Sequence, residues 1–168
     1  PQGRCASIAS CWMTVSSPRW CCLAEMPIPW AILEMVQTRL RTVRKANDFR
    51  TDAGRDVRLE PAPFDPNDAV RLTLYPLTTL HPDDARSAGE RGYTFVVEAL
   101  VPVRLDNAQQ RIVETIADIE DALDSFVQAP LALPLQFQES VLLDRPDGVA
   151  AMAAQLLFGT RYRREQGR

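Results

Sequence analysis

The single histidine of the chain, His81, stands beside two carboxylates, Asp83 and Asp84. A histidine near carboxylates can act as a general base or as a metal ligand. No motif marks a serine or cysteine as its nucleophile, so we interpret the cluster as part of a solvated loop. The competing hypothesis is a small α+β ligand-binding domain or enzyme that uses the His81 loop.

A second group of carboxylates follows a helical pattern. Asp118, Asp121 and Asp124 are spaced by three beside an apolar stripe. Paired carboxylates can serve glycoside hydrolysis or bind cations. Residues three apart on a helix share one flank, and such a charged flank is typical of a solvated helix face. We therefore prefer the solvated face to a catalytic pair.

A sharper hypothesis for these carboxylates is an interface between copies of the chain. The segment from 34 to 58 carries more basic than acidic residues. An acidic helix and a basic segment could pair between neighbouring copies, and such complementarity fixes partner choice more than affinity. In a head-to-tail ring each subunit would present both surfaces. The interface candidates are Arg39, Arg41, Arg44, Arg50, Arg55, Asp118, Asp121 and Asp124.

The sequence gives no support for a cofactor, a metal or a nucleic-acid site. The glycines form no phosphate-binding motif, and the formal net charge is −3, which provides no general basic field for DNA or RNA. No apolar run is long enough to cross a membrane. The spacing of the cysteines does not match a zinc site. They are Cys5, Cys11, Cys21 and Cys22.

The first 25 residues differ from the rest of the chain. They hold every cysteine, show no period of two or 3.6 residues, and lack the pattern of a signal peptide. Met26 is followed at once by a good helix pattern. We therefore expect Met26 to be the natural start, with 1–25 arising from an upstream reading frame or a misassigned gene start. The alternative is a genuine disordered or partner-bound arm. Residues 26–168 are expected to form a single domain.

The first half of this domain reads as a helix followed by short strands. Pro29 suits the first turn of a helix that fades near Ala46, and Gly54 suits the positive φ of a turn. Pro76 is expected to end a strand, leaving 77–92 as an extended loop. The predicted elements are a helix over 29–46 and strands over 56–60 and 70–75.

The second half gives the strongest signals. β-branched and aromatic residues dominate 93–103, and Asp106 with Gln109 forms a capping box at the start of the next helix. The last segment has alanines that favour helix and an alternation that favours strand, and we predict strand. The elements are strands over 93–103, 136–143 and 149–162, a helix over 106–128, and a tight turn at 145–148. This order predicts a small sheet with a helix across one face.

From Met26 onward this order of elements resembles the tail terminator proteins of long-tailed bacteriophages. The similarity rests on the N-terminal helix and the segment Phe49 to Val57, the Leu-Thr-Leu-Tyr-Pro strand end at 72–76, and the Ile-Ala-Asp-Ile helix at 116–119. A terminal hairpin ending in Tyr-Arg at 162–163 completes it. No single motif is specific, because the family is identified by order and pattern.

The resemblance implies an α+β fold, with a small mixed or antiparallel sheet and two helices packed on it. It also implies a structural protein without catalytic residues, located in the virion at the tail–neck junction after assembly in the host cytoplasm. Its partners would be other copies of itself in a ring, usually a hexamer, the major tail tube protein and a neck or head-completion protein. DNA would only pass through the central hole, and acidic side chains of the second helix there would let it slide. Tube or neck contacts are expected from the loop residues His81, Asp83, Asp84 and Arg86.

Overall fold

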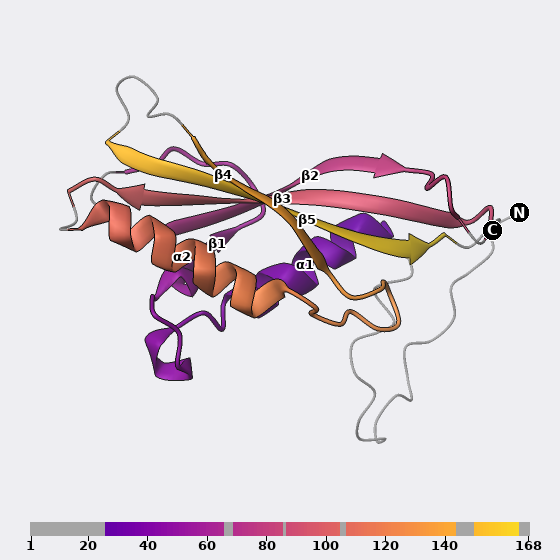
Figure 1. The fold of residues 1–168 in the computed structure, drawn as a ribbon, viewed down its shortest axis with the longest axis horizontal. Helices are drawn as coiled ribbons and strands as arrows, with labels where there is room; N and C mark the ends of the chain where they lie inside the picture. Colours follow the sequence, from indigo (N-terminus) through magenta and orange to yellow (C-terminus); the bar gives the residue numbers. More distant parts are fainter. Residues whose placement is uncertain (1–25, 66–68, 86, 105–106, 144–149, 165–168) are drawn as a thin grey trace, which may run out of the picture.

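Five strands form one mixed sheet, and two helices cover one of its faces (Figure 1). The computed structural model describes residues 26–65, 69–85, 87–104, 107–143 and 150–164. The strand order is β1-β2-β3-β5-β4; β1 is parallel to β2, and every other neighbouring pair is antiparallel. The elements are α1 (Ile28–Leu40), β1 (Asp56–Arg58), β2 (Arg71–Leu80), β3 (Glu90–Pro102), α2 (Ala108–Leu123), β4 (Gln136–Leu143) and β5 (Ala151–Arg163). The predicted α+β class, with two helices on a small mixed sheet, is confirmed.

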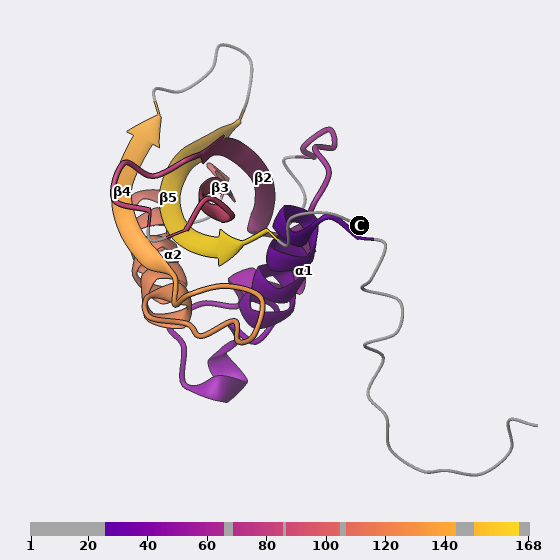
Figure 2. The same ribbon diagram turned by 90° about the vertical axis from the view of Figure 1, so that its right-hand side faces the viewer.

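The core lies between the helices and the sheet. Figure 2 shows both helices on the same side of the strongly curled sheet. β3 and β5 pair along their whole length, so that Phe95 faces Phe158 with ring centroids 6.0 Å apart. Alternate residues of both strands are buried against the helices because successive side chains of a strand point to opposite faces. The ambiguous last segment is therefore a strand, as predicted, held between β3 and β4.

α2 is an amphipathic helix whose buried side includes Ile112, Ile119 and Leu123. It ends at Leu123, earlier than the expected 128, because Asp124 is extended and Ser125 takes a left-handed φ of 59°. At its start Asn107 is also left-handed and makes no side-chain cap hydrogen bond. Asp106 and the turn 145–148 lie outside the described residues, as do residues 1–25.

α1 ends at Leu40, earlier than the expected 46, and the chain then packs back on the helix end through Gly54. The Gly54 N–H donates to the carbonyl of Val43 at 2.9 Å. A Cβ on Gly54 would meet the carbonyl oxygens of Leu40 and Val43, the latter at 2.8 Å. Its φ is not in the left-handed region, so the positive φ expected from the turn pattern is wrong. Glycine is needed here for the close approach of two backbones.

The expected loop 77–92 is much shorter in the structure. β2 continues through Pro76 to Leu80, with an irregularity between Pro76 and Thr78, and β3 begins at Glu90. β1 covers only the first residues of β2, so Pro76 lies in an edge position, where a missing N–H is tolerated. The connection between the strands is therefore 81–89. Among the described residues, no helix has the length and apolar character to cross a membrane.

Candidate functional site

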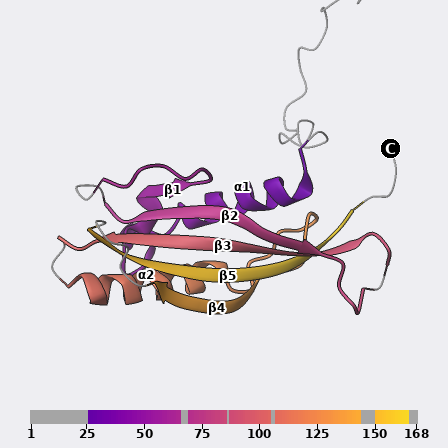
Figure 3. The same ribbon diagram turned by 90° about the horizontal axis from the view of Figure 1, so that it is seen from above.

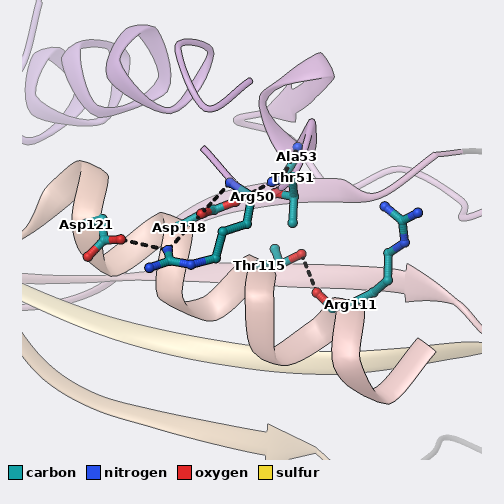
Figure 4. A network of polar contacts seen from close by, with 7 residues as sticks. All are labelled: Arg50, Thr51, Ala53, Arg111, Thr115, Asp118 and Asp121. Atoms are coloured by element: carbon teal, nitrogen blue, oxygen red, sulfur yellow. Dashed lines mark hydrogen bonds and ion pairs between the residues drawn. The ribbon is translucent and has the colours of Figure 1, made fainter. Parts of the chain in front are cut away.

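A buried carboxylate joins α2 to the segment that follows α1 (Figure 4). The side chain of Asp118 is fully buried. One of its oxygens accepts the backbone N–H and the hydroxyl of Thr51, both at 2.7 Å. The other accepts the backbone N–H and the Nη1 of Arg50, both at 3.1 Å. Four donors thus satisfy a charge that would otherwise be expensive to bury.

The sequence prediction of a solvated face is therefore wrong for Asp118. A spacing of three gives the flank of a helix but does not tell what packs against that flank. Asp121 remains exposed and binds Arg50 at 2.7 Å, so the acidic helix and the basic segment do meet, here within one chain. Hydrogen bonds to Asp121 and then Asp118 raise the pKa of Arg50. Asp124 is exposed.

Arg39 is also used inside the chain. Its Nε donates to the carbonyl of Ala122 at 2.9 Å, and its guanidinium lies 5.6 Å from the centre of the Phe126 ring. A cation at the C-terminal end of a helix satisfies free carbonyls and the negative end of the helix dipole. Of the basic interface candidates, Arg39 and Arg50 thus hold α2 in place.

The remaining basic candidates, Arg41, Arg44 and Arg55, stay at the surface. Together with Lys45, which is also exposed, we call them the basic corner. They come from adjacent segments, because Gly54 packs on the end of α1 and Arg44 donates to the carbonyl of Arg41 at 3.3 Å. Within the corner, Arg55 pairs with Asp52 at 3.2 Å in an exposed contact.

Acidic residues crowd the C-terminus of α2, the end of the helix to which Arg39 binds. Glu120 stands among Asp121 and Asp124, and burial followed by the repulsion of these two carboxylates raises its pKa. Negative charge at a helix C-terminus also opposes the helix dipole. The corner and this cluster therefore carry opposite charges on different elements.

The described residues of the connection around His81 form no catalytic arrangement. His81 is exposed, and its Nδ1 lies 3.0 Å from the carbonyl of Pro82. Asp83 is exposed, while Asp84 pairs with Arg161 of β5 at 2.9 Å. Arg161 also contacts Glu90 at 3.3 Å. Hydrogen bonds to Asp84 and then Glu90 raise the pKa of Arg161; Arg86 lies outside the described residues.

A cleft of about 1080 Å³ lies next to this connection, between it and the segment 129–134. Pro82, Asp84 and Ser87 line it, but His81 does not. Tyr93 also lines it, and the Tyr93 hydroxyl is buried without a hydrogen-bond partner among the described residues. Burial, and then Tyr162, raise the pKa of Tyr93. No group of three or more metal-ligating side chains forms within the part of the chain that the structure describes.

Sequence reasoning missed one buried charge altogether. Arg71 of β2 is 2% exposed and donates through Nε to Asp56 of β1 at 2.9 Å. Its Nη1 donates to the carbonyls of Ala62 and Pro63, and its guanidinium lies 5.3 Å from the Phe64 ring centre. Polar and apolar residues alternate in β2, and this alternation predicts that Arg71 lies on the polar face of the strand. Nothing in the sequence indicates that another segment covers that face. Burial raises the pKa of Asp56, but hydrogen bonds from Arg58 and then Arg71 outweigh it and leave that pKa lowered.

Comparison with known proteins gives a likeness of fold. A chain in the virion of a native gene transfer agent particle superposes with a TM-score of 0.56 at 19% identity, over 77% of this chain and 92% of that one. A second solved chain, which carries only a sequence identifier for a name, reaches a TM-score of 0.46 at 19% identity over 82% of this chain and 98% of that chain. No protein-family profile matches the sequence. A search of curated proteins found no significant match.

Proposed function

We propose that this chain is a structural protein of a phage-like particle, which caps the finished tail tube as a ring and joins the tail to the head or neck. The observation that carries the proposal is the fold likeness to a chain of a gene transfer agent virion, which extends over 92% of that chain. The order of elements, which resembles the tail terminators, supports the finer role.

The proposed mechanism is steric. A closed ring covers the growing edge of the tube, so that the next tube subunit finds no complementary surface. The opposite face of the ring then receives a neck or head-completion protein, and DNA passes through the hole. The proposal assigns no catalytic role to His81, whose exposed ring lies against the carbonyl of the neighbouring Pro82.

The structure changes which residues serve in this mechanism. Asp118 is buried and fully hydrogen-bonded within its own chain, so it is not free to line a hole or bind a neighbour. Arg39 and Arg50 also contact α2, but the side chain of Arg50 stays 53% exposed. The exposed candidates are the basic corner, Arg50, Asp121 and Asp124 for the ring, and His81, Asp83 and Asp84 for the tube or neck.

The experiment is to purify the full chain, measure its mass by light scattering, and image it by electron microscopy alone and with purified tail tubes. We expect closed rings, free or at one end of each tube. Particles from cells lacking the gene should carry tubes of irregular length that are not joined to heads. Tubes of normal length, properly joined in its absence, would contradict the proposal.

A related role, as another head–tail connector or a minor tail protein, shares the fold but predicts another location. Antibody-gold labelling of intact particles distinguishes them: label at the tail–neck junction supports the terminator, and label elsewhere supports the alternative.

A second class of function follows from the cleft beside the His81 connection. Its volume is about that of a small-molecule pocket. The observation that favours it is the buried Tyr93 hydroxyl, which has no hydrogen-bond partner among the described residues. In that case the purified chain would be a monomer that binds a small molecule in the cleft. Tyr93→Phe would weaken this binding, and His81→Ala, at a residue that does not line the cleft, would leave it unchanged. A small-molecule library screened by thermal shift provides the measurement.

A further inference from the structure

The cleft beside the β2–β3 connection has a glycine in the middle of its floor. It lies at the end of the sheet where β2 leads into β3 and where β5 ends (Figure 3). Thr94 of β3 pairs with Gly159 of β5, and Gly159 pairs in turn with Gln136 of β4. Their neighbours Phe95 and Phe158 are buried in the core, so this row of three residues faces away from the helices. Gly159 therefore leaves room on the uncovered face of the sheet.

A bulge in β4 brings a second carboxamide onto this floor. The pairing of β4 with β5 is irregular between Phe137 and Glu139, and Gln138 is the extra residue without a partner on β5. Its side chain lies directly over Gly159, because a Cβ added to that glycine would meet Cδ of Gln138 at 3.2 Å. Bulges often re-aim a side chain next to a functional site. Gln136 and Gln138 thus both present carboxamides to the cleft.

Both carboxamides can bind a ligand as they stand. Gln136 and Gln138 are exposed, and neither side chain makes a hydrogen bond among the described residues. A carboxamide has N–H donors and a carbonyl acceptor, which are the groups that a peptide backbone presents in turn. Two carboxamides on one strand therefore match an extended chain, whose N–H and C=O groups recur at regular intervals.

The charges that line the cleft cancel. In the part of the chain that the structure describes they are two carboxylates, Asp84 and Glu90, and two guanidinium groups, Arg161 and Arg163. Arg161 binds Asp84 at 2.9 Å and Glu90 at 3.3 Å. Because the formal charges sum to zero and three of the four groups bind one another, the cleft favours an uncharged ligand.

Apolar side chains form the rim. Leu80 of β2 is 64% exposed and Leu133 is 57% exposed, and both line the cleft. Among the described lining residues the aromatic rings are those of Tyr93 and Tyr162, which are 2% and 8% exposed. Such buried rings offer no face on which a nucleobase could stack. The volume of about 1080 Å³ is at the upper end for a small-molecule pocket and suits a stretch of extended chain.

One wall of the cleft is the connection 81–89, in which the sequence predicts contacts to the tube or neck. Pro82 packs on the sheet, with its Cγ 3.6 Å from the position that a Cβ on Gly92 would take. Asp84 is bound to Arg161 of β5. These contacts hold the wall in place before a partner arrives, which lowers the entropy that binding must overcome.

We propose that this cleft receives an extended, uncharged segment of a different protein of the particle. The backbone of that segment binds Gln136 and Gln138, and its apolar side chains pack on Leu80 and Leu133. Peptide recognition of this kind takes its affinity from main-chain hydrogen bonds and its specificity from alternate side chains. The inference rests on the proposed function and names the surface through which the ring meets the tube or neck.

A binding measurement tests the chemistry of the segment. The probes are labelled overlapping peptides that span the tail tube and neck proteins of the same particle, titrated with the full chain and followed by fluorescence anisotropy. We expect an uncharged peptide to bind. Gln136→Ala combined with Gln138→Ala should weaken it by about tenfold or more, because hydrogen bonds of about 1 kcal/mol each are lost. N-methylation of the peptide backbone should cause a similar loss.

A matched pair of substitutions tests the site in the particle. Leu133→Asp places a charge on the apolar rim, and Val127→Asp is the control, because Val127 is 58% exposed but does not line the cleft. Each variant is supplied to cells that lack the gene. With Leu133→Asp we expect rings of normal size that fail to join tubes to heads, and with Val127→Asp we expect normal particles. Both side chains are exposed, so the unfolding midpoint should stay unchanged.

The outcomes separate this inference from the proposed function. Particles that join normally with Leu133→Asp overturn the cleft as the contact but leave the ring function intact. Loss of the rings themselves with this variant would place the cleft in the subunit contact and also overturn the inference. So would a cleft that binds no tube or neck peptide but is stabilised by a small molecule in a thermal-shift screen. A wild-type chain that forms no rings, alone or on tubes, overturns the proposed function itself.

Discussion

The side chain of Asp118 on α2 accepts both the hydroxyl and the backbone N–H of Thr51, each at 2.7 Å. The two residues are 67 positions apart, and both are buried. This contact fastens the segment after α1 to the middle of α2 and fixes the relative placement of the two helices. It also places Arg50 where it reaches Asp121.

We predict that Asp118→Ala destabilises the chain by about 3–5 kcal/mol, because it leaves the buried N–H and hydroxyl of Thr51 without an acceptor and removes the acceptor of the Arg50 backbone N–H. The measurement is the free energy of unfolding in urea. Asp124→Ala is the control on the same helix; its side chain is exposed, and the change should cost less than about 0.5 kcal/mol. Equal effects of the two substitutions would contradict the role given to Asp118.

Gly54 gives a second prediction. Gly54→Ala should destabilise the fold by about 1–3 kcal/mol, since the added methyl group meets two backbone carbonyls that cannot rotate away. Gly92→Ala is the matched control, because a Cβ there has its nearest contact at 3.6 Å, on Pro82. That change should leave stability unchanged or raise it by up to about 1 kcal/mol. Thermal unfolding followed by circular dichroism distinguishes the two.

The crowded carboxylates at the end of α2 predict a pH dependence. The pKa of Glu120 is raised in the folded state, so the folded chain binds this proton more tightly than the unfolded chain does. Ionisation of Glu120 therefore costs stability as pH rises through its folded-state pKa, and the cost is absent below the ordinary value of 4.5. Glu120→Gln should stabilise the isolated subunit by about 0.3–1 kcal/mol at neutral pH.

Urea unfolding of this variant at pH 7 and near pH 4 provides the measurement, and the gain should shrink at the lower pH. Glu114→Gln is the control, because Glu114 lies in the first half of α2, away from the C-terminal carboxylates, and accepts a hydrogen bond from Gln110. A gain from Glu120→Gln that is the same at both pH values would show that charge is not its cause.

The regular elements could be predicted because their signals are local. The β-branched run at 93–103 and the apolar spacing of 112–123 each contain the pattern of one buried face. The strand 136–143 has the bounds that its residues predict. The ends of the elements were predicted less accurately. Pro76 does not end β2, because this part of the strand lies at an edge of the sheet, where proline is tolerated.

The candidate site residues could also be predicted only in part. The opposite charges of the segment 34–58 and of α2 could be seen in the sequence, and Arg50 does meet Asp118 and Asp121. What the pattern could not provide is the burial of Asp118 or of Arg71, since burial depends on segments distant in the chain that cover each side chain.

The sequence by itself determined the α+β class, the type of each main element and the opposite charges of two segments, because these depend on neighbouring residues. Only the tertiary structure decided which charged side chains bind partners within the chain and which remain at the surface. It also decided that β4 lies at an edge with its apolar residues exposed. The physical reason is that strand order and side-chain burial are set by contacts between distant segments, and a one-dimensional pattern does not contain them.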